Sequence, residues 1–173
     1  MSHLSIRPAK LSDAVAIADI HVETWKSAYA GILPTAYLGK LDRTERLRFW
    51  QNLLSDVDTC RHVSIAEVNA VPIGFLSHGL ARDPQFQDWR EIYAFYVAPD
   101  FQGIGAGTAL LKQALSQIQN RGDMGAYLWV IAANPARYFY EAQNGHLLSE
   151  RTEPIAQQNH RMLAYGWQVE PDI

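Results

Sequence analysis

A glycine-rich segment at residues 102–108 constrains the fold of this chain more than any other feature. The residues before it, 91–97, are rich in aromatic and β-branched side chains and predict a strand. The residues after it carry apolar side chains at helical spacing up to Gly122, which is typical of an amphipathic helix that ends at a glycine. Glycines at a helix start leave backbone N–H groups unpaired at the positive end of the helix dipole. This stretch therefore predicts a site for a phosphate-bearing ligand.

Two common nucleotide-binding loops do not fit this segment. The P-loop requires a lysine and a serine or threonine after its last glycine, whereas Gly107 is followed by Thr108 and Ala109. The dinucleotide fingerprint requires G-x-G-x-x-G, and its third glycine would fall on Thr108 or Leu110. The pattern that remains is Gln-Gly-x-Gly-x-Gly after a strand.

That pattern resembles the pyrophosphate-binding motif R/Q-x-x-G-x-G/A of the Gcn5-related N-acetyltransferase (GNAT) superfamily. Gln102, Gly105 and Gly107 fill its fixed positions. Two other stretches are similar to the same family: HVETWKSAYAGILP at residues 21–34 resembles the first helix of many bacterial members, and LWVIAANPARYFYEAQNG at residues 128–145 resembles a later motif. The resemblance covers nearly the whole chain.

Periodicity and turn residues predict one domain over residues 1–173 with an α/β fold. The expected architecture is a mixed, mostly antiparallel twisted sheet of about six to seven strands flanked by helices, in the order β-α-α-β-β-β-α-β-α-β-β. Ser12 and Asp13 are predicted to cap the first helix, and Asp42 the second. This element order is the one that the GNAT resemblance implies.

Composition excludes several classes of function. The net charge of −3 argues against non-specific nucleic-acid binding. A single cysteine, Cys60, excludes an internal disulfide, and the histidines show no metal-ligand spacing, so no metal is expected. The N-terminus lacks an apolar signal region and no apolar run has the length of a membrane span, so we expect a cytoplasmic protein that does not associate with a membrane.

The resemblance implies an enzyme that transfers the acetyl group of acetyl-CoA to a primary amine by direct attack in a ternary complex. The acceptor is then a small-molecule amine or a peptide N-terminus, and a homodimer is possible. The implied cofactor contacts are the backbone of the fourth strand, the glycine loop and two later residues: Phe95, Tyr96, Val97, Gln102, Gly103, Ile104, Gly105, Ala106, Gly107, Thr108, Asn134 and Tyr140. The fourth and fifth strands are expected to splay apart, and the Ile104 side chain is expected to turn into the core.

The family position of Tyr140 implies an acid that protonates the leaving thiolate, since a phenol titrates above a thiol. The alternative is a tyrosine of the core. Glu91, at the start of the fourth strand, is the implied base for the amine and a possible substrate contact. The alternatives are a solvent-exposed strand-end glutamate and a chain of water molecules as base. Trp25 and Tyr29 lie in the region that forms the acceptor pocket of relatives, although aromatic residues are more often part of the core.

Two other functions stay open on the sequence. One is a non-catalytic regulatory or assembly module that binds acyl-CoA with the same fold. The other is a transferase for longer acyl chains, against which the bulky residues 93–96 argue. The acidic residues Asp83 and Asp88, together with Glu91, can favour a cationic amine, or can belong to a solvated loop.

Overall fold

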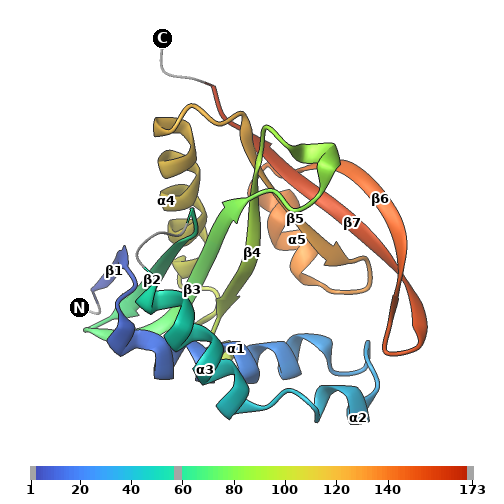
Figure 1. Cartoon of the computed structure of the whole chain (residues 1–173), viewed down its shortest axis with the longest axis horizontal. Coiled ribbons are helices and arrows are strands. Elements are labelled where there is room, and N and C mark those ends of the chain that lie inside the picture. Colours follow the sequence, from blue (N-terminus) through green and yellow to red (C-terminus); the bar gives the residue numbers. More distant parts are fainter. Residues whose placement is uncertain (1–2, 57–59, 171–173) are drawn as a thin grey trace.

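The computed structural model describes residues 3–56 and 60–170. A seven-stranded sheet of order β1-β2-β3-β4-β5-β7-β6 forms its centre (Figure 1). Helices α1 and α3 cover one face, and α4 and α5 the other. The elements are β1 Leu4–Pro8, α1 Ala14–Tyr29, α2 Thr35–Leu38, α3 Arg43–Ser55, β2 His62–Val68, β3 Val71–Leu80, β4 Arg90–Val97, α4 Ala106–Asn120, β5 Gly125–Ile131, α5 Ala136–Ala142, β6 His146–Ile155 and β7 Gln158–Gln168. The predicted fold class and element order are confirmed, with α2 as a short additional helix.

Local chemistry explains most of the boundaries. Asn69 and Ala70 both adopt left-handed φ angles, 51° and 66°, and close the β2–β3 hairpin. The Asp42 carboxylate accepts hydrogen bonds from the backbone N–H groups of Thr44 and Glu45, so its predicted capping role is confirmed.

The predicted cap of the first helix is wrong. A short 3-10 turn, Leu11–Asp13, precedes α1, and Asp13 makes no capping bond to that helix. Its carboxylate instead accepts two hydrogen bonds from the Arg7 guanidinium, at 2.8 and 2.9 Å, and one from the Lys10 N–H at 2.7 Å. A nearby arginine on β1 competes for the carboxylate, and the sequence does not reveal that proximity. These bonds hold the pKa of Asp13 below its ordinary value.

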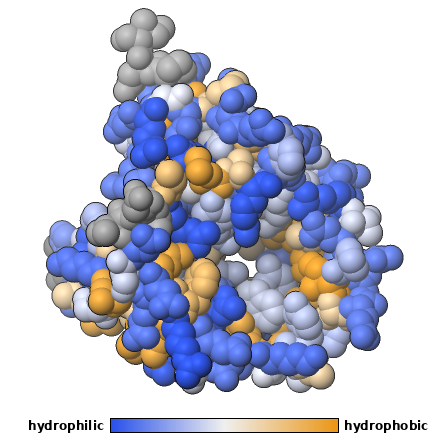
Figure 2. All heavy atoms as spheres, viewed as in Figure 1, coloured by the Kyte–Doolittle hydropathy of each residue, from blue (hydrophilic) through white to orange (hydrophobic). Residues whose placement is uncertain are grey.

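Two irregularities open the sheet beside the glycine loop. The β3–β4 register shifts between Ser77 and His78, which leaves one extra residue in β4 and bends that strand. Strand β4 then pairs in parallel with β5 only at its start, where Arg90 lies opposite Ala126 and Glu91 opposite Tyr127. Beyond these pairs the two strands diverge, as the expected splay requires. The same view in space-filling form shows a hollow near the centre of this face (Figure 2).

One buried and one partly buried histidine make stability depend on pH. His78 is 1% exposed, and burial lowers its pKa to about 4. His21 stacks on Tyr96, its Nδ1 accepts a hydrogen bond from Trp50 Nε1, and burial lowers its pKa to about 4 as well. In the unfolded chain both titrate near their ordinary value of ~6.5. Between the two values the unfolded state therefore binds more protons, and stability is lost as pH falls.

We expect the free energy of unfolding, measured with urea, to fall from about pH 7 to about pH 4, with up to roughly 3 kcal/mol from His78. His78→Gln is the matched variant. It should lower stability at neutral pH and flatten the slope, because glutamine does not titrate. A wild-type stability that does not change across this range would contradict the expectation.

Candidate active site

The glycine loop forms a backbone cradle at the N-terminus of α4. Gly103 and Gly105 have left-handed φ angles of 82° and 89°, which glycine adopts without strain. The first helical hydrogen bond runs from Ala109 N to Gly105 O, so the N–H groups of residues 106–108 have no acceptor within the helix. Those groups, and the dipole behind them, can bind an anion.

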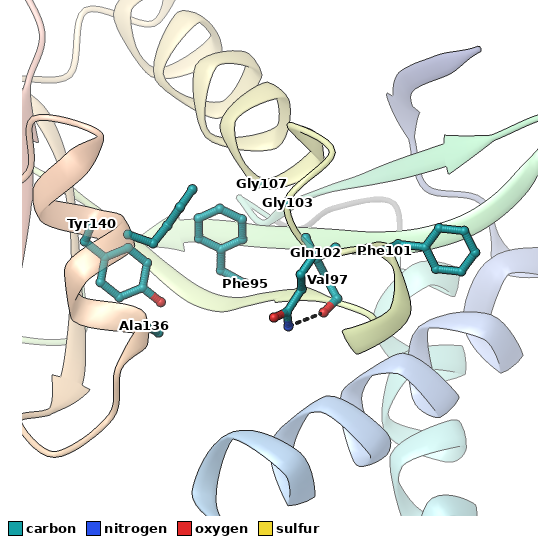
Figure 3. Close-up of a pocket in the computed structure, with 9 residues that line it drawn as sticks. Phe95, Val97, Phe101, Gln102, Gly103, Gly107, Ala136 and Tyr140 are labelled. Atoms are coloured by element: carbon teal, nitrogen blue, oxygen red, sulfur yellow. Dashed lines mark hydrogen bonds between the residues drawn. The ribbon is translucent and has the colours of Figure 1, made fainter. Parts of the chain in front are cut away.

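A pocket of about 310 Å³ lies against this cradle. We call it the loop-side pocket; its lining residues are Phe95, Val97, Phe101, Gln102, Gly103, Gly107, Ala136, Phe139 and Tyr140 (Figure 3). At Gly107 a Cβ would lie 3.1 Å from the Phe139 ring, a close contact that the ring would have to relieve by a small shift. Of the seven predicted loop residues, Gln102, Gly103 and Gly107 line this cavity, whereas Ile104, Gly105, Ala106 and Thr108 do not. The cavity adds Phe101, Ala136 and Phe139, which the sequence did not single out for this role.

Two loop side chains differ in direction. Ile104 is 51% exposed, so the expectation that it turns into the core is wrong. Gly103 and Gly105, both with positive φ, flank it in a tight turn that points its side chain to solvent. Ala106, the first residue of α4, is instead 1% exposed and packs in the hydrophobic core.

The exposed backbone of β4 can be assigned by alternation. Ala98 N donates to Ile73 O at 2.8 Å, so the N–H groups of alternate residues, including Tyr96, face β3. The N–H and C=O groups of Phe95 and Val97 therefore face the opening toward β5. Gln102 Nε2 donates to Val97 O at 3.1 Å, which agrees with this assignment and ties the loop to the strand end. Of the three predicted β4 residues, two expose backbone groups and Tyr96 does not.

Tyr140 stands at the meeting point of two cavities. It is 8% exposed and lines both the loop-side pocket and a second one of about 150 Å³, the α1-side pocket. Figure 3 shows its hydroxyl pointing across the cavity toward Gln102. Within the described part of the chain that hydroxyl has no hydrogen-bond partner, and burial raises its pKa well above that of a free phenol. At neutral pH it is a proton donor.

The α1-side pocket is lined by Thr24, Ala28, Tyr29, residues 92–97, Gln102, residues 128–130, Asn134, Ala136 and Tyr140. It holds Tyr29 but not Trp25, which packs on the rings of Tyr29 and Tyr37 with centroids 5.2 and 5.9 Å away. The substrate role of Trp25 stays a prediction. Thr24 was missed, although it continues the buried stripe of α1 that includes Ile17 and Ile20, where a polar residue is a signal.

Asn134 connects the two sides of the pocket. Its Oδ1 accepts a hydrogen bond at 2.9 Å from the N–H of Ala136, the first residue of α5, although the N-cap position itself is Pro135. Since Oδ1 is occupied by that bond, the side-chain amide faces the Tyr29 hydroxyl as a donor, and this contact limits the rise that burial causes in the pKa of Tyr29. Tyr29 can then direct its own O–H into the pocket.

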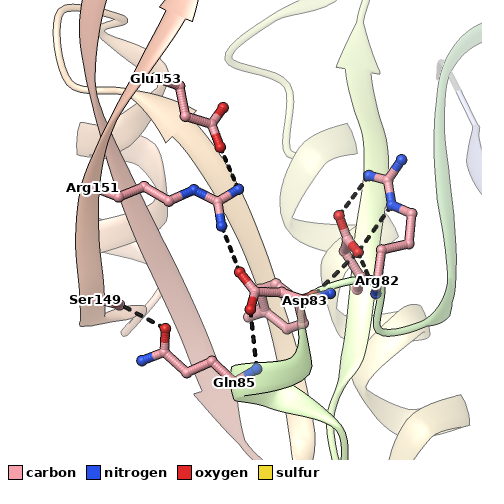
Figure 4. Close-up of polar contacts among 8 residues, drawn as sticks. Arg82, Asp83, Gln85, Ser149, Arg151 and Glu153 are labelled. Carbon is pink, nitrogen blue, oxygen red and sulfur yellow. Dashed lines mark hydrogen bonds and ion pairs between the residues drawn. The ribbon is translucent and has the colours of Figure 1, made fainter.

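Glu91 lies outside both pockets. It is 5% exposed, its carboxylate accepts hydrogen bonds from Arg82 N at 2.9 Å and from Tyr127 Oη at 3.1 Å, and it pairs with the Arg82 guanidinium at 2.5 Å (Figure 4). The carboxylate is therefore neither the solvent-exposed group nor a lining group of the cavity. Its role as a base stays a prediction. The sequence contains no signal that Arg82, nine residues earlier, folds back onto it.

The other acidic residues of this region do not reach the pockets either. Asp83 Oδ2 pairs with Arg151 at 2.6 Å, and Arg151 also pairs with Glu153 (Figure 4). Asp88 is exposed, which agrees with the alternative that it belongs to a solvated loop. Residues 3–56 and 60–170 contain no group of three or more His, Cys, Asp or Glu residues arranged to hold a metal ion. No helix in these ranges is both long and apolar enough to cross a membrane.

Replacing Glu91 with glutamine separates a structural role from a catalytic one. Glutamine keeps a neutral acceptor for Tyr127 and Arg82 N but loses the ion pair, whose arginine is 66% exposed. We expect a stability loss of about 1 kcal/mol, measured by urea unfolding, because exposed partners weaken such pairs. The pH profile of turnover should keep its shape. A profile displaced along the pH axis would instead identify Glu91 as the base.

Comparison with known proteins agrees with this geometry. The family model described as the acetyltransferase (GNAT) family matches residues 18–146. The uncharacterized N-acetyltransferase YuaI of Bacillus subtilis is 31% identical over 171 residues, which are 98% of this chain and 94% of that protein. The probable N-acetyltransferase Rv2775 of Mycobacterium tuberculosis is 33% identical over 150 residues, which are 84% of this chain and 82% of the relative.

Solved structures share the fold. The PaiA N-acetyltransferase of Thermoplasma acidophilum in complex with coenzyme A superposes with a TM-score of 0.69 at 20% identity and covers 95% of this chain and 99% of its own. YncA of Salmonella typhimurium, solved with its cofactor acetyl-CoA, also gives a TM-score of 0.69 at 21% identity, with 96% and 94% coverage.

Proposed function

This chain belongs to the GNAT family of acetyltransferases, and on that premise we propose that it is an acetyl-CoA-dependent N-acetyltransferase. It transfers the acetyl group to a primary amine by direct attack in a ternary complex. The acceptor is a small-molecule amine or a peptide N-terminus. The chain acts in the cytoplasm without a metal, a membrane or a nucleic acid, alone or as a homodimer.

The observation that carries the proposal is the meeting of two pockets at Tyr140. The loop-side and α1-side pockets share Phe95, Val97, Gln102, Ala136 and Tyr140. A cofactor whose pyrophosphate lies on the glycine loop can therefore extend along β4 and present its thioester at the shared residues. An amine approaching from α1 reaches the same point. Two substrates brought together in this way react without a covalent enzyme intermediate.

The residues at this point can carry out three tasks. The N–H groups of Phe95 and Val97 are free to bind the oxyanion that forms when the amine attacks, and one such donor is worth ~3 kcal/mol of barrier. The Tyr140 hydroxyl is placed to give its proton to the departing thiolate. Removal of the proton from the amine is assigned to water, because Glu91 is paired elsewhere.

The shape of the shared region favours a small acyl group. Aromatic rings enclose it, with Phe95 and Tyr140 centroids 6.2 Å apart and Phe95 and Phe139 centroids 5.7 Å apart. A longer acyl chain would have to displace these rings.

A free-thiol assay tests the proposal. The protein is mixed with acetyl-CoA and a panel of small amines and short peptides, and released CoA is measured together with the acetylated product. We expect release that depends on the amine. Tight binding of acetyl-CoA without release for any acceptor would identify a non-catalytic module instead.

A further inference from the structure

The α1-side pocket carries no charged side chain among the described residues that line it. The polar side chains that line it are neutral: four tyrosines, one threonine, two amides and one indole, namely Tyr29, Tyr93, Tyr96, Tyr140, Thr24, Gln102, Asn134 and Trp129. Glu23 and Glu141, next in sequence to the lining residues Thr24 and Tyr140, are exposed and do not line the pocket. Asp83 and Glu91 are paired with arginines and also lie outside it. The pocket therefore offers no anion to hold an ammonium group.

Arginine side chains pack against the aromatic rings that line the pocket. Arg61 and Arg82 lie over the Tyr93 ring, with guanidinium carbons 4.2 and 4.6 Å from its centroid, and Arg151 lies over Trp129 at 3.9 Å. Arg46 of α3 acts electrostatically on Tyr96. Arg82 is paired with Glu91, and Arg151 with Asp83 and Glu153, so these arginines do not act on an amine as isolated charges.

None of the titratable groups that face the pocket accepts a proton near neutral pH. Burial raises the pKa values of Tyr29, Tyr96 and Tyr140, so these phenols stay protonated. Burial also raises the pKa of Tyr93. His21, behind Tyr96, has its pKa lowered to about 4, and its Nδ1 is already bonded to Trp50.

We propose that the acceptor is a weakly basic amine, the α-amino group of an uncharged amino amide or peptide, and that it enters the pocket without charge. This inference rests on the proposed function. An ammonium ion would lose its hydration in a neutral pocket with no compensating carboxylate. A peptide α-amino group titrates at ~7.7–8.0 and an alkyl amine such as that of lysine at ~10.4, so at about pH 7.5 the neutral fractions differ ~250-fold.

Two unpartnered groups favour an amide next to the amine. Thr24 Oγ1 and Trp129 Nε1 are buried without a hydrogen-bond partner in the described part of the chain, and both residues line the pocket, one from α1 and the other from β5. Buried donors normally have partners. A neutral carbonyl one bond from the amine-bearing carbon can supply an acceptor here, whereas a polyamine has none and a free carboxylate would find no cation in the lining.

The test compares glycinamide, n-propylamine, cadaverine and glycine as acceptors, by thiol release across about pH 6.5 to 9.5. At neutral pH we expect glycinamide to exceed n-propylamine at least ~100-fold in kcat/KM. Each amine should show its own break, at its own pKa. Thr24→Val, which keeps the shape and removes the hydroxyl, should lower kcat/KM about tenfold for glycinamide and little for n-propylamine.

Three results would overturn the inference. Cadaverine or n-propylamine as the best acceptor at neutral pH would exclude a weakly basic substrate. A single break near neutral pH, shared by all amines, would show that a protein base removes the proton. Both outcomes would leave the proposed function intact. Absence of release with every amine, while acetyl-CoA still binds, would overturn the proposed function and this inference together.

Discussion

Replacing Tyr140 with phenylalanine is expected to lower turnover by more than about tenfold, because general acid catalysis commonly contributes at least that much. Among the described residues, Tyr140 is the one hydroxyl-bearing residue that lines both pockets. The ring, which packs among Phe95, Tyr165 and Trp167, stays in place. Acetyl-CoA affinity, measured by isothermal titration calorimetry, should therefore change little.

Tyr138→Phe is the matched control for this prediction. Tyr138 lies two residues away on α5 and is 59% exposed, with its hydroxyl 3.2 Å from Arg137 Nη2. Its replacement should leave turnover near that of the wild type. If Tyr140→Phe also turned over at nearly the wild-type rate, Tyr140 would be a core residue and water would protonate the thiolate.

The second large effect is expected at the glycine loop. Gly105→Ala places a Cβ at a φ angle of 89°, at the N-cap residue that precedes α4. No atom of the described residues lies within 4 Å of that Cβ, so the cost is backbone strain of about 1 kcal/mol. A loop that relieves this strain turns its N–H groups away from the pyrophosphate. We expect affinity for acetyl-CoA, by calorimetry, to fall at least about tenfold.

Gly122→Ala controls for the strain alone. Gly122 has a φ angle of 79° and follows the other end of the same helix, and a Cβ added there would also have no atom of the described residues within 4 Å. Both variants should lose similar stability in urea, and only Gly105→Ala should lose cofactor affinity. Equal affinity in the two variants would mean that the loop does not hold the pyrophosphate.

The parts of the fold with strong local patterns could be predicted from the sequence. These patterns involve residues that are close in the chain. Alternating side chains before Asn69 predict β2, and helical spacing after Gly105, ended by Gly122, predicts α4. The loop-side cavity follows from these elements, because a strand, a glycine loop and a helix start must lie together. Tyr140 was assigned to the same site because the stretch at residues 128–145 resembles a later motif of the GNAT family.

The features that the sequence did not reveal depend on side-chain pairings without a sequence signal and on local backbone angles. The Asp13 carboxylate bonds to the Arg7 guanidinium of β1 instead of capping α1. The Glu91 carboxylate, whose role as a base stays a prediction, bonds to the side chains of Arg82 and Tyr127. Neither pairing has a periodic or spacing signal. Ile104 was expected in the core because it is apolar, but the positive φ angles on both sides of it decide its direction.

Thiol release from acetyl-CoA in the presence of glycinamide is the measurement that tests the central claim most directly. The account predicts stoichiometric CoA and N-acetylglycinamide, saturable in both substrates, with no product when either is omitted. Initial-rate plots should intersect, because both substrates must be bound before the acetyl group moves. Parallel plots, or an acetylated protein that forms without amine, would contradict direct transfer at the junction of the two pockets.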